Sequence, residues 1–354
     1  LKLIFLGDLI MNKKHIFIFL IIAPLLAISM SIVQVYYSVY HWGYQGEDTI
    51  FAIESGDTFS RINYKLSQRK IIYSARLFHQ YTKFQSELEN FKVGRYEIKT
   101  GMTMPQVLET LTSGNSITIS VTIPEGKNLF QIAEILEEKK ITSAKDFMKL
   151  AKSKAMAKKL SIPSHRVEGY LYPDTYQFPE NSKAEFVLNS MVDNFNKKVN
   201  GLDFSKTKFS KHEVIILASV VEKETGASFE RPRIAGVFTN RLKKRMRLQS
   251  DPTTIYGIYE RYDGNIRKRD LLEKTPYNTY KINGLPAGPI ANPGLESIKA
   301  VINPEKHDYL YFVSKNDGTH IFTKTYKDHL KAVNTWQKTS SNRKGRSWRD
   351  LKKK

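Results

Sequence analysis

An uncharged segment near the N-terminus constrains this chain more than any other feature of its sequence. Residues 16–40 contain no Asp, Glu, Lys or Arg, and residues 16–33 are almost wholly apolar. A helix rises about 1.5 Å per residue, so about 20 apolar residues cross a hydrocarbon core of about 30 Å. The segment therefore predicts a single transmembrane helix.

The residues on either side of this segment predict its orientation. Lys13 and Lys14 precede it, and positive charge favours the cytoplasmic side of a membrane. Three tyrosines and a tryptophan between residues 36 and 42 follow at interface depth. A cleaved signal peptide is the alternative, but the apolar run is long and no A-x-A site closes it. We expect a single-pass anchor in the cytoplasmic membrane, with the chain beyond about residue 45 outside the cytoplasm.

Length, cysteine content and charge set further bounds. The 354 residues suffice for about two domains, and the absence of cysteine excludes disulfide frameworks and thiolate metal sites. A formal charge of +21 indicates polyanionic surroundings: nucleic acid, anionic lipid or an acidic cell-wall polymer. A location outside the cytoplasm argues against nucleic acid as the partner. Met11 precedes the two lysines, which leaves open a natural start there with residues 1–10 upstream of it.

Three stretches, beginning at Phe51, Tyr96 and Val121, share one pattern of strand, turn and helix. The shared positions are an apolar strand residue (Ile53, Ile98, Ile123), a glycine (Gly56, Gly101, Gly126), a Thr or Asn (Thr58, Thr103, Asn128) and two apolar residues four apart (Ile62 and Leu66, Val107 and Leu111, Ile132 and Leu136). Glycine adopts positive φ at the least cost, Thr and Asn cap helix N-termini, and i,i+4 spacing makes an apolar helix stripe. Singly these residues are turn and core positions, but together they predict a repeated strand–turn–helix module. The module resembles the LysM type of glycan-binding module.

Changes in composition divide the chain into four parts. We expect residues 1–45 to be a cytoplasmic stub and anchor, and residues 46–160 to be the LysM-like region. From about residue 160, Pro, Gly and Asn turns separate short apolar runs, which predicts a mixed α/β domain over residues 161–335. Residues 336–354 carry eight Lys or Arg against one Asp, which is typical of a disordered, solvated tail. The predicted fold class is α+β.

A buried helix in the second half carries two candidate carboxylates. A capping box at Ser210 and Glu213 opens it, and residues 214–221 are apolar except for one serine. Glu222 and Glu224 follow at its end and lie about 200° apart on the helix, so they cannot face the same cleft.

We expect Glu222 to be the functional carboxyl, because it continues the stripe of Ile215 and Ala218 whereas Glu224 points away from it. Desolvation and the negative end of the helix dipole both favour a protonated carboxyl, the form that a general acid needs. The alternative is a glutamate that is simply solvated at a helix end.

Polar loops follow this helix at residues 247–258 and 275–304, and a strand is expected at residues 309–313. Rigid loops beside a buried acidic helix predict a carbohydrate cleft, in which Tyr stacks on sugars and Asn or Gln binds hydroxyls. The candidate substrate-binding residues are Gln249, Asp251, Thr253, Tyr277, Asn278, Tyr280 and Asn292. We expect no metal or cofactor, because H-E-x-x-H, G-x-S-x-G and P-loop motifs are missing from the sequence and its eight histidines show no ligand spacing.

The run LASVVEKETGASFERPRIAGVFTNRLKKRMRLQSDPT at residues 217–253 closely resembles the YceG-like family of endolytic murein transglycosylases. VEGYLYPDTYQFP at residues 167–179 and the PYNTY and GLPAGPIANPG segments within residues 276–294 resemble it too. The similarity covers about residues 47–334. Ser250 stands where Thr is more usual and Ala287 interrupts a common Pro-Pro, and neither departure touches the acid.

The resemblance implies one transmembrane helix, a LysM-like region and a catalytic domain distantly like lysozyme-type transglycosylases. It implies endolytic cleavage of the MurNAc–GlcNAc bond in nascent peptidoglycan, with a 1,6-anhydro-MurNAc end, termination of glycan elongation and peptidoglycan synthases as partners. The family's essential glutamate is matched to the first Glu of the E-K-E-T run, Glu222.

Two alternatives stay open at the level of sequence. Hydrolysis normally needs two carboxylates, whereas a lytic transglycosylase can use one, because the C6 hydroxyl of the sugar is the nucleophile. Asp251 would be the second carboxylate of a hydrolase, although its place in the Q-S-D-P-T turn favours a turn-forming role. The other alternative is a non-enzymatic scaffold that binds the wall through its LysM-like region.

Overall fold

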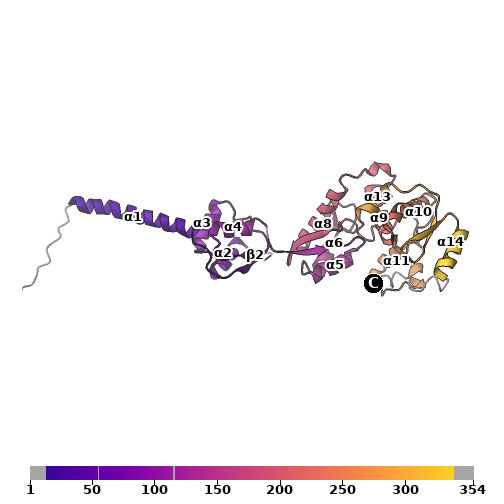
Figure 1. Ribbon diagram of the computed structural model, residues 1–354, viewed down its shortest axis with the longest axis horizontal. Helices are drawn as coiled ribbons and strands as arrows, with labels where there is room; N and C mark the ends of the chain where they lie inside the picture. Colours follow the sequence, from indigo (N-terminus) through magenta and orange to yellow (C-terminus); the bar gives the residue numbers. More distant parts are fainter. Residues whose placement is uncertain (1–12, 55, 115, 339–354) are drawn as a thin grey trace, which may run out of the picture. The chain divides into compact units, whose positions relative to one another are not determined.

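The computed structural model describes residues 13–54, 56–114 and 116–338, and it divides into two compact units, Leu1–Thr118 and Ile119–Lys354. Each unit has its own hydrophobic core. Figure 1 shows the helices and strands of both units, coloured along the sequence. The expectations for residues 1–10 and for most of the basic tail, residues 339–354, lie outside the described residues.

The first unit begins with the long helix α1, Lys13–Tyr40. Its segment Leu20–Tyr40 has a mean hydropathy of 1.9 and is long and apolar enough, by length and composition, to cross a membrane. The end of α1 is attached to the folded part of this unit: Val39 and Tyr44 are buried, and the Tyr44 N–H donates to the Met102 carbonyl over 2.9 Å.

The rest of the first unit has the order β1–α2–α3–β2–α4. Strands β1 and β2 pair in antiparallel fashion, with Phe51 opposite Tyr96, and both of these side chains are buried in the core. The bounds are β1 Thr49–Ile53, α2 Phe59–Gln68, α3 Ala75–Phe84, β2 Gly94–Ile98 and α4 Met104–Thr112.

The turn glycines, N-caps and helix stripes of the repeat are confirmed in all three copies, whereas the predicted strand residue of the third copy, Ile123, lies just after its strand, Thr118–Thr122. The turn glycines have positive φ: 95° at Gly56, 85° at Gly101 and 76° at Gly126. Thr58, Thr103 and Asn128 are the N-caps of α2, α4 and α5 (Leu129–Glu138), and the predicted helix stripes are buried.

The third copy belongs to the second unit. The two units therefore meet between Thr118 and Ile119, and not near residue 160 as expected. The strand of this copy, β3 (Thr118–Thr122), pairs with β4 (Thr175–Pro179), and the helix residues Ile132 and Leu136 join the second core. Strand pairing and burial, rather than the sequence repeat, thus set the division between Thr118 and Ile119.

The second unit surrounds α9 (Lys211–Glu224) with helices and one further strand pair. The predicted strand at residues 309–313 is present as β5, slightly later in the chain, and pairs with β6 in antiparallel fashion. The remaining bounds are α6 Ala144–Ala151, α7 Lys154–Lys159, α8 Ala184–Val199, α10 Arg231–Lys243, α11 Asp251–Gly257, α12 Lys268–Leu272, α13 Leu295–Ile302, β5 Tyr311–Ser314, β6 His320–Thr323 and α14 Tyr326–Val333. With two-stranded sheets among many helices, the described residues have an α+β fold.

Helix α9 is the buried helix that the sequence predicts. The Ser210 hydroxyl and the Glu213 carboxylate cap each other's backbone N–H groups at its start, and every side chain from Val214 to Val221 is buried. Helices α10, α11 and α13 pack around it. The C-terminal end of α9 is therefore held rigidly where the chain emerges from the core.

Candidate functional site

The two glutamates at the end of α9 face different surroundings. Glu222 lies against protein: its Oε1 is 3.2 Å from Nη2 of Arg231, and its side chain is only 7% exposed. Its Oε2 accepts hydrogen bonds from the Gly294 N–H over 3.1 Å and the Ser297 hydroxyl over 2.7 Å. Glu222 therefore ties α9 to the starts of α10 and α13.

Glu224 lies in a cleft of about 460 Å³. Its Oε1 accepts a hydrogen bond from the Ser250 hydroxyl over 2.5 Å. Burial raises the pKa of the Glu224 carboxyl to about 7; the bond from Ser250 opposes this rise, and the negative charge of Asp251 adds to it. A carboxylic acid with this pKa is partly protonated at neutral pH, as a general acid requires.

Three predicted substrate-binding residues, Gln249, Asp251 and Tyr280, line the cleft with Glu224 and not with Glu222. The expected angular separation of the two glutamates agrees with these different surroundings. Glu222 was expected to face the cleft, but Glu224 is the one that lines it. The stripe that Glu222 continues is fully buried, so it leads to contacts with neighbouring helices instead of to an open surface.

The floor of the cleft is a tight turn before α11. Gln249 has φ +50°, which is uncommon for a residue other than glycine and often marks a functional site. Its N–H donates to the Thr279 carbonyl over 3.2 Å. Asp251 begins α11, and its Oδ1 accepts a hydrogen bond from the Tyr280 hydroxyl over 2.6 Å. This contact links the two loops that the sequence singled out.

Three other predicted binding residues, Thr253, Asn278 and Asn292, are fully buried and brace the loops instead. The Thr253 hydroxyl donates to the Ser250 carbonyl over 2.6 Å, which shapes the turn beneath Glu224. Polar side chains in Pro- and Gly-rich loops must satisfy backbone groups first, and that requirement accounts for the difference from the expected sugar contacts.

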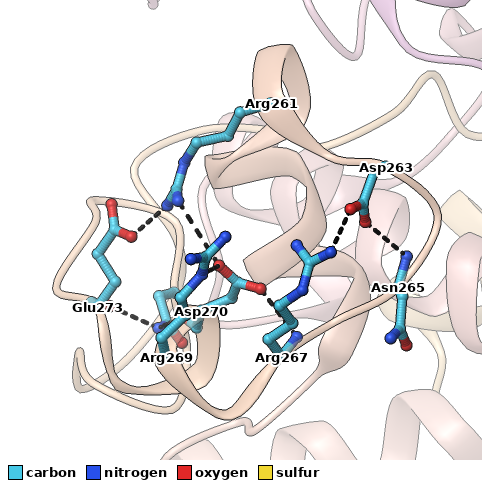
Figure 2. Close-up of polar contacts among 8 residues, drawn as sticks. Arg261, Asp263, Asn265, Arg267, Arg269, Asp270 and Glu273 are labelled. Atoms are coloured by element: carbon cyan, nitrogen blue, oxygen red, sulfur yellow. Dashed lines mark hydrogen bonds and ion pairs between the residues drawn. The ribbon is translucent and has the colours of Figure 1, made fainter.

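Asn278 holds the segment that joins α11 to the second loop. Its amide nitrogen donates to the carbonyls of Asp270 over 3.2 Å and Glu273 over 2.6 Å. Figure 2 shows the ionic cluster on this segment, in which Arg261 contacts both Asp270 and Glu273 and the Arg267 N–H donates to Asp270. The cluster stabilises the loop that carries Tyr280.

Asn292 belongs to a buried network around Glu168, a residue that our sequence analysis did not single out. The Asn292 Oδ1 accepts from the N–H groups of Gly169 and Leu171, both over 2.9 Å, and its amide donates to Glu168 over 2.9 Å. Glu168 also accepts from the Tyr256 hydroxyl over 2.8 Å, and burial raises its pKa to about 7.

The last predicted residue, Tyr277, packs beside this network. Its ring meets Tyr256 edge-on at 4.8 Å between centroids, and burial raises the pKa of its hydroxyl. Tyr277 is partly buried and does not line the cleft around Glu224. We therefore assign it a packing role.

Strands β5 and β6 complete the cleft with residues that no sequence motif indicated. His320 lines it, and its Nδ1 lies 2.7 Å from Oε2 of the buried Glu230. Arg241 of α10, inside the run at residues 217–253 although not singled out there, also lines it and donates to the Leu248 carbonyl over 2.7 Å. These residues come from separate segments, so only the folded chain brings them together.

Two further hollows share Lys223 as a lining residue. A small extension of about 180 Å³ shares Glu224 and His320 with the main cleft, and a hollow of about 670 Å³ contains Gln131 and Tyr259. Within the described ranges, no group of three or more His, Cys, Asp or Glu side chains is arranged to hold a metal ion.

Comparison with known proteins places the chain in a family. The model of the YceG-like family matches residues 51–335. The chain belongs to the YceG-like family. It is 35% identical to an endolytic murein transglycosylase of Bacillus subtilis (strain 168) over 298 residues, which are 79% of this chain and 82% of that protein.

Two further relatives extend the comparison. An endolytic murein transglycosylase of Streptococcus pneumoniae (strain ATCC BAA-255 / R6) is 30% identical over 79% of this chain and 57% of its own length. The crystal structure of a YceG-like protein from Listeria monocytogenes, 35% identical, matches with a TM-score of 0.56 and covers 80% of this chain and 99% of that one.

Proposed function

We propose that this YceG-like protein is an endolytic lytic transglycosylase that cuts the MurNAc–GlcNAc β-1,4 bond within nascent peptidoglycan strands and so terminates their elongation. Its relatives named endolytic murein transglycosylase support the reaction class. The observation that carries the proposal is one carboxyl, Glu224, with a pKa of about 7 in a polar cleft. The two further hollows that share Lys223 suit a strand that is bound in its middle.

In the proposed mechanism Glu224 acts twice. Its protonated carboxyl donates the proton to the glycosidic oxygen as the bond from that oxygen to C1 of MurNAc breaks. The resulting carboxylate then takes the proton of the C6 hydroxyl of the same MurNAc, whose oxygen bonds to C1. The products are a GlcNAc 4-hydroxyl and a 1,6-anhydro-MurNAc end, and Glu224 is protonated again.

Glu222 has a different proposed role, as a positioning residue. Both of its oxygens are engaged, by Arg231 on one side and by Gly294 and Ser297 on the other. Such a carboxylate holds α9 at a fixed angle, and thereby aims Glu224 into the cleft. This proposal replaces our sequence-based assignment of Glu222 as the acid.

The test compares Glu224→Gln with Glu222→Gln in release of anhydro-muropeptides from purified peptidoglycan. Glutamine keeps the size of the side chain but cannot donate the proton. We therefore expect Glu224→Gln to be slower than wild type by about 10²–10⁴-fold or more. We expect Glu222→Gln to melt at a lower temperature, because Arg231 loses one of its two carboxylate partners. The activity that remains in Glu222→Gln should decline as pH rises past about 7, as the activity of wild type does.

Two results would contradict the assignment. One is an active Glu224→Gln enzyme. The other is a Glu222→Gln enzyme that is inactive at an unchanged melting temperature. The second result would restore Glu222 as the acid.

A hydrolase is the second candidate, because Asp251 lines the same cleft as Glu224. A hydrolase leaves reducing ends and loses its activity with Asp251→Asn, since it needs two carboxylates. A transglycosylase leaves anhydro ends and keeps activity in this variant. Mass spectrometry of the digested glycan distinguishes them.

The first unit and the anchor complete the proposal. The order β1–α2–α3–β2 supports a LysM-like module that binds glycan, and the buried acidic helix α9 supports a distant likeness of the second unit to lysozyme-type enzymes. The apolar helix α1 supports a single-pass anchor in the cytoplasmic membrane. Peptidoglycan synthases stay a predicted partner, from family resemblance alone.

A further inference from the structure

An apolar groove of about 650 Å³ lies between α1 and α3 in the first unit. Eight of its lining residues come from α1 between Ala27 and Tyr40, and the others are Leu77, Gln80 and two aromatics of α3, Tyr81 and Phe84. None of these side chains carries a charge. A groove of this kind is poorly suited to water.

Aromatic contacts show how α3 runs along α1. Tyr73, just before α3, meets Trp42 at 5.6 Å between ring centroids, and Tyr81, near the end of α3, meets Tyr40 at 6.1 Å. Helix α3 therefore turns back along α1, and its last residue, Phe84, is 83% exposed. Phe78 of α3 is buried in the core of the first unit, and Leu77 and Tyr81 are partly buried against the same core.

The groove lies at the depth of the outer leaflet if α1 crosses a membrane. Ala27 and Tyr40 are 13 residues apart, which corresponds to about 20 Å along a helix. Apolar residues precede Ala27 in α1, so the inner leaflet is spanned before the groove begins.

We propose that α3 is a membrane-immersed helix: Leu77, Tyr81 and Phe84 lie in the outer leaflet of the membrane that α1 crosses, and phospholipid acyl chains fill the groove. This inference rests on the anchor in the proposed function. The groove is continuous with the membrane-spanning segment, and that continuity is the reason to assign lipid as its occupant.

Charges on and after α3 set how deep it lies. Arg76 and Lys83 are exposed, and long cationic side chains can reach the phosphates of lipid headgroups. Glu87 and Glu89 follow α3 and stay in the aqueous headgroup layer. Phe84 therefore reaches the boundary between headgroups and acyl chains, and not the bilayer centre.

The absence of cysteine allows a direct test with single labels. Phe84→Cys and Tyr64→Cys in the full chain each receive an environment-sensitive fluorophore and are reconstituted into phosphatidylcholine–phosphatidylglycerol vesicles. Tyr64 is the matched control, because it is 63% exposed on α2 and does not line the groove. We expect nitroxide lipids labelled near the headgroup to quench the label at residue 84 at least about threefold more than the label at residue 64. Aqueous iodide should show the opposite order.

Two results overturn the inference: equal quenching of both labels by iodide, or a label at residue 84 that neither reagent reaches. The second result indicates a protein, such as another copy of this chain, in the groove. Carbonate extraction separates this inference from the anchor itself. A chain that stays in the membrane while its label at residue 84 reports water retains the anchor and loses only the immersed helix.

Discussion

At the scale of single residues, the end of α9 shows how two identical side chains acquire different chemistry. Glu222 lies against the guanidinium of Arg231, whereas Glu224 has a single hydroxyl partner, Ser250, and the negative charge of Asp251 nearby. Removing a carboxylate from water favours the protonated acid, and at Glu224 this effect outweighs the opposing charges of Arg241 and Lys223. The cleft therefore favours a protonated carboxyl at Glu224, the form that the proposed mechanism needs.

The raised pKa of Glu224 has a consequence for stability. A carboxyl whose pKa is higher in the folded chain binds more protons there, so folding stability falls as pH rises from about 4.5 to about 7. Glutamine has no such penalty. We expect Glu224→Gln to melt at least about 2 °C above wild type at pH 8, and at the same temperature as wild type below pH 4.

Thermal melting of both proteins from pH 4 to pH 9 measures this difference, and the buried Glu168 is common to both. A difference that stays constant with pH would mean that Glu224 titrates normally in the folded chain.

The sequence predicted part of this site. The separation of Glu222 and Glu224 follows from helix geometry alone, but which side of α9 opens to solvent depends on how α13 packs. Gln249, Asp251 and Tyr280 were predicted because turn residues near an acid form clefts. Asn278 and Asn292 were assigned to substrate because an amide that binds sugar and one that braces a loop are identical in sequence.

At the scale of elements, the repeat was predictable because it combines several local signals. A glycine at positive φ, an N-cap two residues later and an apolar stripe each depend on few neighbours. The unit to which a copy belongs depends on distant partners, and the pairing of β3 with β4 could not be predicted from the repeat.

Gly101 tests the turn at this scale. It has φ +85°, a Cβ atom added to it would meet no other atom within 4 Å, and its N–H donates to the Tyr44 carbonyl over 2.7 Å. Space is therefore available, and strain in Gly101→Val comes from the backbone alone, at about 1 kcal/mol or more. Chemical denaturation measures it, with Gly201→Val, which has open space and no positive φ, as the control. Equal stability of the two variants would contradict the proposed turn.

At the scale of the whole molecule, the proposed function depends on both the apolar segment and the cleft. The proposed substrate lies outside the cytoplasm, so the proposed function requires the cleft on that side. Among the described helices, α1 is long and apolar enough to cross a membrane. The basic residues at the start of α1, Lys13 and Lys14, favour that orientation.

We therefore expect alkaline phosphatase fused to the C-terminus to be active in cells, because its disulfides form only outside the cytoplasm. Deletion of residues 16–40 from the same fusion is the matched control, and should remove the activity by keeping the enzyme inside. N-terminal sequencing of the mature chain then distinguishes an anchor from a signal peptide. An inactive full-length fusion contradicts the orientation, and a mature N-terminus beyond residue 40 contradicts the retained helix. Since the immersed position of α3 requires α1 beside it, the second result would also remove the membrane contact of Phe84.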